Sequence, residues 1–494
     1  MVQPEIPQVT FTAHYEGKFI LNGGTFMKPE LLDFLEKARQ HCLNPSILPD
    51  PALLSKREHY CAQPMIEYRQ CVDEGKDVAA LKPLFEGLDE MPDSLEKEQL
   101  AYGLFEEISA AEQRRDYPYT EPSDLEDIRQ YNQGNQVSQK IPTAVELKEK
   151  IHGAWMGRII GCMAGKPIEG IYRKELIPFL KEIGNYPFSR YILRKDLNDE
   201  LCAKYKFDFN SRKYPDECSF AISDDDTNYT VLGWKIIDKF GRDFTTEDVG
   251  RTWIYKQPKY AYCTAELVAF LNVTNGYRPP HTATRMNPYR EWIGAQIRAD
   301  YYGYINPGNP GMAAEMAWRD ASLSHVKNGI YGAMWVAAML AQAAVSNDIK
   351  EIILTGLREI PAMSRLYESI ISVIARWEDG ADFETCMSMI YDRWDDEKSY
   401  DWCHTIPNAQ IVAAALLYGD GDFAQSICLA VQSGFDTDCN GATVGSIVGL
   451  INGAAGIPEE WAEPIHNKLE TTIFGIGTVA VDELVEKTMR HLPN

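Results

Sequence analysis

The chain has no closely spaced pair of cysteines. Its 11 cysteines are odd in number and scattered from Cys42 to Cys439, and no two form a Cys-x-x-Cys pair. Disulfide frameworks use even numbers of cysteines, and structural zinc sites use closely spaced pairs. The pattern therefore predicts free thiols in a reducing, cytoplasmic compartment and argues against a structural zinc site.

The chain also lacks an excess of positive charge. It has 49 Lys and Arg residues against 72 Asp and Glu residues, a formal net charge of −23. Proteins bind duplex nucleic acid by neutralising its phosphates with cationic side chains, and an acidic surface is repelled by anionic lipids. We therefore expect neither a nucleic acid duplex nor a membrane as a partner. Most of the carboxylates belong to solvated surface, but their excess is compatible with binding divalent cations.

Long hydrophobic runs are missing too. The longest apolar stretch, residues 329–345, is interrupted by Gly332 and Gln342 and is short for a bilayer span, so we expect a buried helix there. The N-terminal residues contain no basic stretch followed by an apolar run, so no signal peptide is expected.

Signatures of nucleotide-binding α/β folds are absent. There is no GxxxxGK[ST] loop and no evident strand–GxGxxG–helix unit, and strong β-alternation is rare. From Thr143 onward the apolar spacing is helical, and the turns carry Gly, Pro and Asp. We predict a compact, all-α, multi-helix domain of about 350 residues. Its most regular helices are expected at 145–164, 227–240, 312–321, 329–345, 408–418 and 440–453.

The N-terminal part differs in character and carries no chemical signature. Residues 116–142 are polar, which predicts a linker or an arm wrapped over a neighbouring domain. We therefore predict an accessory, mainly helical region at 1–140 and a second domain at 141–494. Within the first region we expect a strand at 9–15 and helices at 29–42 and 95–115.

Two of the expected helices carry glycine at every fourth position. Residues four apart share one helix face, and an interior glycine costs up to about 1 kcal/mol relative to alanine. Close approach of another backbone is the usual compensation, and tight packing alone explains the pattern. The packing would also bring Glu169 and residues 436–439, at the helix ends, into one cleft. The glycines are Gly153, Gly157, Gly161 and Gly165, and Gly441, Gly445, Gly449 and Gly453.

Two acidic motifs stand just before expected helices. Helix capping explains a single Ser or Asp at such a place. Three successive aspartates exceed what one cap needs, and their repulsion is unfavourable unless a cation neutralises it. Mg²⁺ prefers oxygen ligands, so the motifs would form a two-metal site if the fold brings them together. They are Ser223-Asp224-Asp225-Asp226-Thr227 and Asp436-Thr437-Asp438-Cys439-Asn440.

The second motif also begins like an EF-hand calcium loop. The EF-hand needs an acidic twelfth residue, whereas this chain has Ile447 there, and the residues after Gly441 are small and apolar. The EF-hand interpretation therefore fails.

Three separated blocks of the sequence occur in a fixed order. They are residues 153–169, which end at Glu169; Asp225-Asp226-Thr227; and residues 434–438, followed by the second glycine-rich helix. In this order they resemble the ADP-ribosylglycohydrolase family, which includes the dinitrogenase reductase-activating glycohydrolases and the ADP-ribosyl-acceptor hydrolases. The resemblance extends from about Thr143 to the C-terminus.

The resemblance implies an all-α fold with two Mg²⁺ ions in a central cleft, with Mn²⁺ able to substitute. It implies ADP-ribose or an ADP-ribosylated substrate as the partner, and it places Glu169 beside the substrate ribose. The metal ligands that it implies are Asp225, Asp226, Asp436 and Asp438.

Three positions depart from the family pattern. Asp224 stands where many members have Thr or Ser, Cys439 where many have Thr, and Cys162 where many have Asp. A carboxylate can replace a hydroxyl ligand of Mg²⁺, whereas a thiol is a poor substitute. We include Asp224 and Cys439 among the candidate metal ligands, with Cys439 acting through its backbone or a water, which leaves the occupancy of one metal open.

Glycoside cleavage passes through an oxocarbenium-like state assisted by acid–base groups. Two Mg²⁺ ions would chelate the ribose 2′ and 3′ hydroxyls and lower the pKa of a bound water. The candidate base is Asp226 or Asp438, and Glu169 is the candidate gating or acid–base residue.

Three further residues are candidates for substrate binding. His325 lies where family members often have a histidine near the cleft, and Asn328 follows about one turn later. Arg298 would bind a pyrophosphate. The alternatives are a structural role for His325 and a buried ion pair, for example with Asp300, for Arg298.

The expected function is hydrolysis of an N- or O-glycosidic bond to the ribose of ADP-ribose, which removes ADP-ribose from a protein or a small molecule. One alternative is hydrolysis of another ribosyl nucleoside or nucleotide compound. A second is a noncatalytic ADP-ribose-binding or structural protein, although clustered carboxylates argue against it. A two-metal phosphoesterase is a third, weaker alternative.

Overall fold

The computed structural model describes residues 19–20, 26–27, 63–138 and 140–493. The chain divides into two compact units, Met1–Tyr117 and Pro118–Asn494. The strand expected at 9–15 and the helix expected at 29–42 lie outside the described residues. The division into an accessory region, 1–140, and a second domain, 141–494, stays a prediction.

In the part of the smaller unit that the structure describes, three helices surround a common core. Buried side chains such as Phe85, Leu88 and Leu104 pack between them. The last of these helices begins after Ser94, whose side chain accepts a hydrogen bond from the backbone N–H of Lys97, and it ends before the predicted boundary at residue 115. The helices are α2 (Pro64–Asp73), α3 (Lys82–Asp89) and α4 (Leu95–Ser109), with a 3-10 turn at Ala79–Leu81 and an antiparallel pair of strands, β1 (Phe19–Ile20) and β2 (Phe26–Met27).

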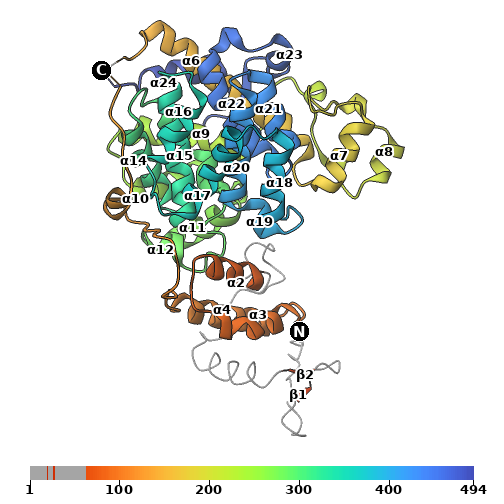
Figure 1. Cartoon of the computed structure of the whole chain (residues 1–494), viewed down its shortest axis with the longest axis vertical. Coiled ribbons are helices and arrows are strands. Elements are labelled where there is room, and N and C mark those ends of the chain that lie inside the picture. Colours follow the sequence, from red (N-terminus) through yellow and green to blue (C-terminus); the bar gives the residue numbers. More distant parts are fainter. Residues whose placement is uncertain (1–18, 21–25, 28–62, 139, 494) are drawn as a thin grey trace, which may run out of the picture. The chain divides into compact units, whose positions relative to one another are not determined.

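The larger unit confirms the all-α prediction (Figure 1). Its described residues contain two short strands, β3 (Lys468–Glu470) and β4 (Thr478–Ala480), which pair antiparallel. The longer helices are α6 (Ala144–Gly165), α7 (Arg173–Glu182), α9 (Asp225–Phe240), α10 (Thr246–Lys256), α11 (Thr264–Thr274), α14 (Pro310–Ala321), α15 (Lys327–Ala343), α16 (Ile349–Leu357), α17 (Arg365–Glu378), α18 (Phe383–Arg393), α20 (Thr405–Gly419), α21 (Phe423–Gln432), α22 (Thr437–Asn452) and α24 (Val481–Met489).

Shorter helical segments connect these elements. Short α-helices are α5 (Leu125–Tyr131), α8 (Asp199–Lys204), α12 (His281–Thr284), α13 (Asp300–Tyr304), α19 (Ser399–Cys403) and α23 (Glu459–Ala462). The 3-10 helices are Lys166–Ile168, Arg194–Asp196, Phe209–Ser211, Pro215–Glu217, Lys259–Ala261, Ile293–Arg298, Ala454–Gly456 and Glu463–Ile465.

All six helices predicted for this unit are present. Each begins slightly earlier than predicted; in α9 this is because the polar residues Asp225 and Asp226 belong to the first turn. The apolar stretch at 329–345 is the buried helix α15, as expected. Among the residues that the structure describes, no helix is both long and apolar enough to cross a membrane.

The two glycine-striped helices, α6 and α22, pack directly against each other. A Cβ atom on Gly157 would lie 2.0 Å from the carbonyl oxygen of Gly445, and one on Gly161 would lie 1.9 Å from that of Gly441. The predicted close backbone approach is therefore confirmed. The Thr437 hydroxyl also donates to the carbonyl of Gly165 at 3.0 Å, so the end of α6 meets the start of α22.

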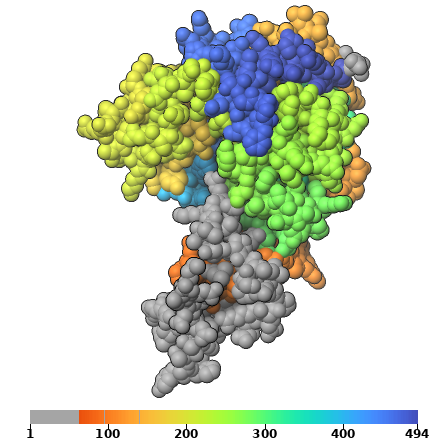
Figure 2. Space-filling view, turned by 180° about the vertical axis from the view of Figure 1, so that it is seen from behind, coloured from red at the N-terminus to blue at the C-terminus, as the bar shows by residue number. Residues whose placement is uncertain are grey.

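The segment between α6 and α9 forms a lobe that contains α7 and α8. It projects from the side of the helical body in both views (Figures 1 and 2). The lobe has its own aromatic cluster, in which Phe179 stacks on Phe209 with ring centroids 4.7 Å apart. It begins directly after Glu169, so it adjoins the end of α6.

The polar segment that precedes α6 lies along the larger unit. The backbone N–H of Thr120 donates to the Met363 carbonyl at 2.9 Å, and that of Gln133 donates to the Arg358 carbonyl at 3.0 Å. A buried ion pair joins Glu121 to Arg365 at 2.8 Å. These bonds bind the segment to helices that follow it by more than 200 residues.

Candidate metal centre

Three helix ends bring the two acidic motifs together. The end of α6 supplies Lys166 and Glu169, the start of α9 supplies Asp224–Asp226, and the start of α22 supplies Asp436–Cys439. The Lys166 ammonium contacts Asp224 at 2.6 Å and Asp438 at 3.0 Å, which places both motifs at one point. The packing of α6 on α22 thus positions Glu169 beside the second motif, as the glycine pattern suggested.

The three aspartates of the first motif have different surroundings. Asp224 caps α9, since its carboxylate accepts the backbone N–H of Asp226 at 3.1 Å. Asp225 is half-buried, and Asp226 is fully buried. One side chain therefore satisfies the cap, and the other two carboxylates have no capping role.

The second motif follows a tight turn. Gly434 and Phe435 both adopt positive φ angles, 76° and 55°. Asp436 occupies the N-cap position of α22, yet its side chain makes no capping hydrogen bond. Its backbone N–H donates instead to the amide oxygen of Asn408 at 3.3 Å. The carboxylates of Asp436 and Asp438 are both buried and project from the first turn of this helix.

Arg158 was not identified from the sequence, although it contacts the centre. It is a fully buried side chain of α6 and pairs with Asp226 at 2.9 Å and Asp300 at 3.3 Å. Its guanidinium donates to Oδ1 of the Asp226 carboxylate and to the Asp226 backbone carbonyl, and it leaves Oδ2 without a donor. A lone arginine inside the apolar, glycine-rich stretch 153–165 was the available signal, because burying an unpaired charge is costly.

Lys166 was also missed. Besides Asp224 and Asp438, its ammonium contacts Glu169 at 2.8 Å. Glu169 also contacts Arg212 of the lobe. The Arg212 guanidinium donates to the backbone carbonyl of Glu169 at 2.8 Å and lies 3.4 Å from the Glu169 carboxylate. The side chain of Glu169 remains 27% exposed, so it is a point at which the buried carboxylates meet solvent.

The carboxylates outnumber the cations that face them. Burial, together with neighbouring carboxylates, raises the pKa of Asp225, Asp226 and Asp436 well above the usual range. Burial and Asp438 likewise raise the pKa of Glu169. Asp224 differs: burial opposes ionisation, but the ion pair with Lys166 lowers its pKa.

The geometry allows a cation to bind at the aspartates. Ligand atoms of Asp226, Asp438 and Cys439 lie within 4.8 Å of one another, and so do those of Cys162, Asp224 and Asp226. Oδ2 of Asp226 and Oδ1 of Asp438 are buried without a hydrogen-bond donor. Buried, unpaired carboxylate oxygens are costly, and a cation between them would remove that cost.

Both thiols of the centre are buried. Burial and the surrounding aspartates raise the pKa of Cys162 and Cys439 well above the usual value, so each remains a protonated thiol in the absence of a cation. A neutral thiol is a weak ligand for a hard ion, and the carboxylates are therefore the stronger donors here.

Arg298 and His325 contact residues other than the aspartates. Arg298 is 2% exposed and donates to Glu266 at 2.6 Å, to Asp320 and to Ser324. His325 is buried beside Ser324 at 2.8 Å, and burial and Arg298 lower its pKa well below the usual value. Both side chains belong to a buried polar cluster, and the structure does not bring them to the metal-ligand candidates.

Asn328 contacts a second buried ion cluster. Its side-chain amide donates to Glu121 at 2.8 Å and to Glu291 at 3.1 Å, and its amide oxygen accepts the backbone N–H of Leu366. Asn328 therefore links α15 to the start of α17 and to the arm that precedes α6.

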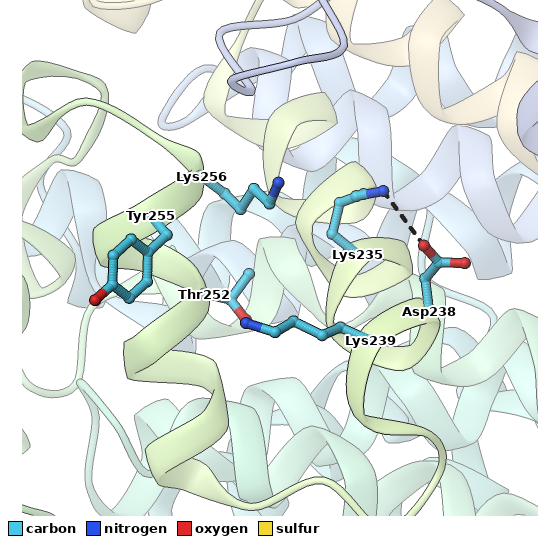
Figure 3. A pocket seen from close by; sticks show the side chains of 6 residues that line it. All are labelled: Lys235, Asp238, Lys239, Thr252, Tyr255 and Lys256. Atoms are coloured by element: carbon cyan, nitrogen blue, oxygen red, sulfur yellow. Dashed lines mark hydrogen bonds and ion pairs between the residues drawn. The ribbon is translucent and has the colours of Figure 1, made fainter.

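A pocket of about 340 Å³ lies elsewhere on α9 (Figure 3). Lys235 is ten residues beyond Asp225, which corresponds to roughly 15 Å along the helix. The pocket is separate from the acidic centre and has the opposite charge. It is lined by Lys235, Asp238, Lys239, Thr252, Tyr255 and Lys256.

An all-α body with an acidic centre at converging helix ends defines the class of this protein, and comparison with known families places it among the hydrolases. The family model described as ADP-ribosylglycohydrolase matches residues 143–492. The chain belongs to the ADP-ribosylglycohydrolase family.

Similarity to solved structures is lower. One similar structure, titled "ADP-ribosylglycohydrolase-related protein complex", has 16% sequence identity, a TM-score of 0.46 and a match that covers 70% of this chain and 98% of that chain. No curated protein matches the chain.

Proposed function

We propose that this protein is a divalent-cation-dependent glycosyl hydrolase that cleaves an N- or O-glycosidic bond to the ribose of ADP-ribose. The observation that carries the proposal is the meeting of Asp226 and Asp438. These residues are more than 200 positions apart, and each presents a buried carboxylate oxygen without a donor. The substrate is an ADP-ribosylated protein or small molecule, and the product is free ADP-ribose.

Magnesium fits the donor set best, because Mg²⁺ prefers carboxylate and water oxygens, and Mn²⁺ would substitute for it. When bound, the cation supplies a Lewis acid that lowers the pKa of water and orients the ribose hydroxyls. The candidate ligands are Asp224, Asp225, Asp226, Asp436 and Asp438, with Cys439 beside them.

Glu169 is suited to proton transfer. Its side chain reaches solvent, and burial and Asp438 raise its pKa, as a general acid that must be protonated near neutral pH requires. It would donate a proton to the leaving group. Asp226 or Asp438 would accept a proton from the attacking water.

The free thiols beside the aspartates support the expected cytoplasmic location of the protein. Cys162 and Cys439 are free thiols next to the aspartates, and such thiols persist in a reducing compartment.

Two substitutions test the proposed function. Both Asp436→Asn and Glu169→Gln preserve the shape of the side chain. The first removes a carboxylate ligand and the second removes the proposed proton donor, and each should reduce release of ADP-ribose by about 100-fold or more, the usual scale for an acid–base group. Asp382→Asn is the matched control, because Asp382 caps α18 and asparagine is an equally good cap. Turnover is measured with Mg²⁺ on ADP-ribosylated arginine and serine peptides. Full activity of Asp436→Asn would contradict the proposed metal site.

A further inference from the structure

Lys166 is held in the centre by three carboxylates. Its Nζ lies 2.6 Å from Asp224, 2.8 Å from Glu169 and 3.0 Å from Asp438. Three carboxylates at this range around one point form an environment that suits a compact cation, and an ammonium has three N–H donors to share among them.

The backbone around Lys166 holds it in this position. It directly follows Gly165, where a Cβ atom would lie 2.3 Å from the Thr437 backbone, and it precedes Pro167. The lysine stem therefore starts at the contact between α6 and α22 and has only a short distance to span to the aspartates.

The family resemblance implies a hydroxyl at position 224, so the carboxylate of Asp224 adds one negative charge to the pattern that the resemblance implies. The Asp224 carboxylate forms an ion pair with the Lys166 ammonium at 2.6 Å. The extra negative charge and the lysine thus neutralise each other within the protein.

The other side of the centre has no such cation. Of the two oxygens in each carboxylate, Arg158 donates only to Oδ1 of Asp226, and Lys166 donates only to Oδ2 of Asp438. Oδ2 of Asp226 and Oδ1 of Asp438 remain unpaired and buried, with the Cys439 thiol beside them. These atoms mark one position for a divalent cation.

We infer that the Lys166 ammonium takes the place of one of the two divalent cations implied by the family resemblance, so that the centre binds a single divalent cation between Asp226 and Asp438. The inference rests on the proposed function only in requiring a divalent cation, and it does not depend on the identity of the substrate.

Counting bound Mn²⁺ tests the inference. The full-length chain is stripped with EDTA and titrated with Mn²⁺ alone, and binding is followed by calorimetry and by the electron paramagnetic resonance signal of free Mn²⁺. The wild-type protein should bind one ion. Lys166→Met, which keeps the length of the side chain without its charge, should bind two. The control, Lys174→Met, removes an exposed lysine that pairs with Glu397 and should bind one.

Two ions in the wild-type protein would overturn the inference and leave the proposed cation dependence intact. One ion in both the wild-type protein and a folded Lys166→Met variant would also overturn it, because the lysine would then exclude nothing. No ion in either protein would overturn the proposed function as well. If Lys166→Met does not fold, the wild-type count alone decides between one ion and two.

Discussion

At the scale of single residues, aspartates that lie close together in the acidic centre have different roles. Asp224 caps a helix and pairs with Lys166, whereas Asp226 pairs through one oxygen and leaves the other unpaired. Residue type and spacing identified the aspartates as a site. They did not identify Arg158 or Lys166, because the aspartates that these cations contact lie 58 residues or more away in the sequence and come close only in the fold.

Glu266 gives a prediction at this scale. Burial, with a smaller contribution from Asp320, raises the pKa of Glu266 to about 7, although the neighbouring Arg298 opposes this shift. Between pH 4.5 and 7 the folded state holds a proton that the unfolded state has lost, so the free energy of unfolding falls as pH rises. Glu266→Gln removes this titration. The stability of the wild-type protein relative to the variant should fall by about 3 kcal/mol across that range.

Chemical denaturation of both proteins at half-unit pH steps measures this difference. Glu247→Gln is the control, because Glu247 lies on the surface at the start of α10. A difference between wild type and Glu266→Gln that stays constant with pH would show that Glu266 does not titrate in this range.

At the scale of elements, the glycine pattern predicted a contact correctly. Glycine at every fourth position leaves a bare helix face, and two such faces pack with backbone against backbone. The glycine pattern also led us to expect that the ends of the two helices meet, but the sequence did not show the turn at Gly434 and Phe435 that precedes Asp436. The starts of α9 and α22 were predicted late because aspartates in a first turn resemble a loop.

Gly161→Ala tests this contact. Its Cβ atom would lie 1.9 Å from the carbonyl oxygen of Gly441, and neither backbone has room to move. We expect a loss of roughly 3 kcal/mol or more of unfolding free energy from overpacking. In Gly250→Ala, on α10, the nearest atom is the flexible Cδ1 of Leu323 at 3.3 Å, so the helix propensity of alanine should leave stability within about 1 kcal/mol of the wild type.

Urea denaturation of both variants gives the comparison. Equal stability of Gly161→Ala and the wild type would contradict the close packing of α6 on α22.

At the scale of the whole molecule, ion pairs join segments that are distant in the sequence. Arg365, at the start of α17, contacts Glu121 of the arm at 2.8 Å and Glu291 at 2.8 Å, and all three side chains are buried. The polar composition of residues 116–142 predicted a linker or an arm, but it did not identify these partners. The family of the protein was predictable because three motifs occur in the family's order. Ion-pair partners that are more than 70 residues apart could be identified only from the fold.

Arg365→Met should destabilise the larger unit by about 3–5 kcal/mol, because it removes the guanidinium that pairs with two buried carboxylates. Arg376→Met, at the end of the same helix, removes a charge outside this cluster and should change stability by less than about 0.5 kcal/mol. Thermal unfolding followed by circular dichroism distinguishes the two. A small effect of Arg365→Met would mean that the ion cluster contributes little to holding the arm.

The most direct test of the central claim is a calorimetric titration of ADP-ribose into the full-length protein, once with Mg²⁺ and once with EDTA. The account predicts micromolar binding with Mg²⁺ and its loss in EDTA, because the carboxylates need a divalent cation to hold the ribose hydroxyls. Equal binding in both conditions, or no binding in either, would contradict the claim that this acidic centre is a cation-dependent site for ADP-ribose.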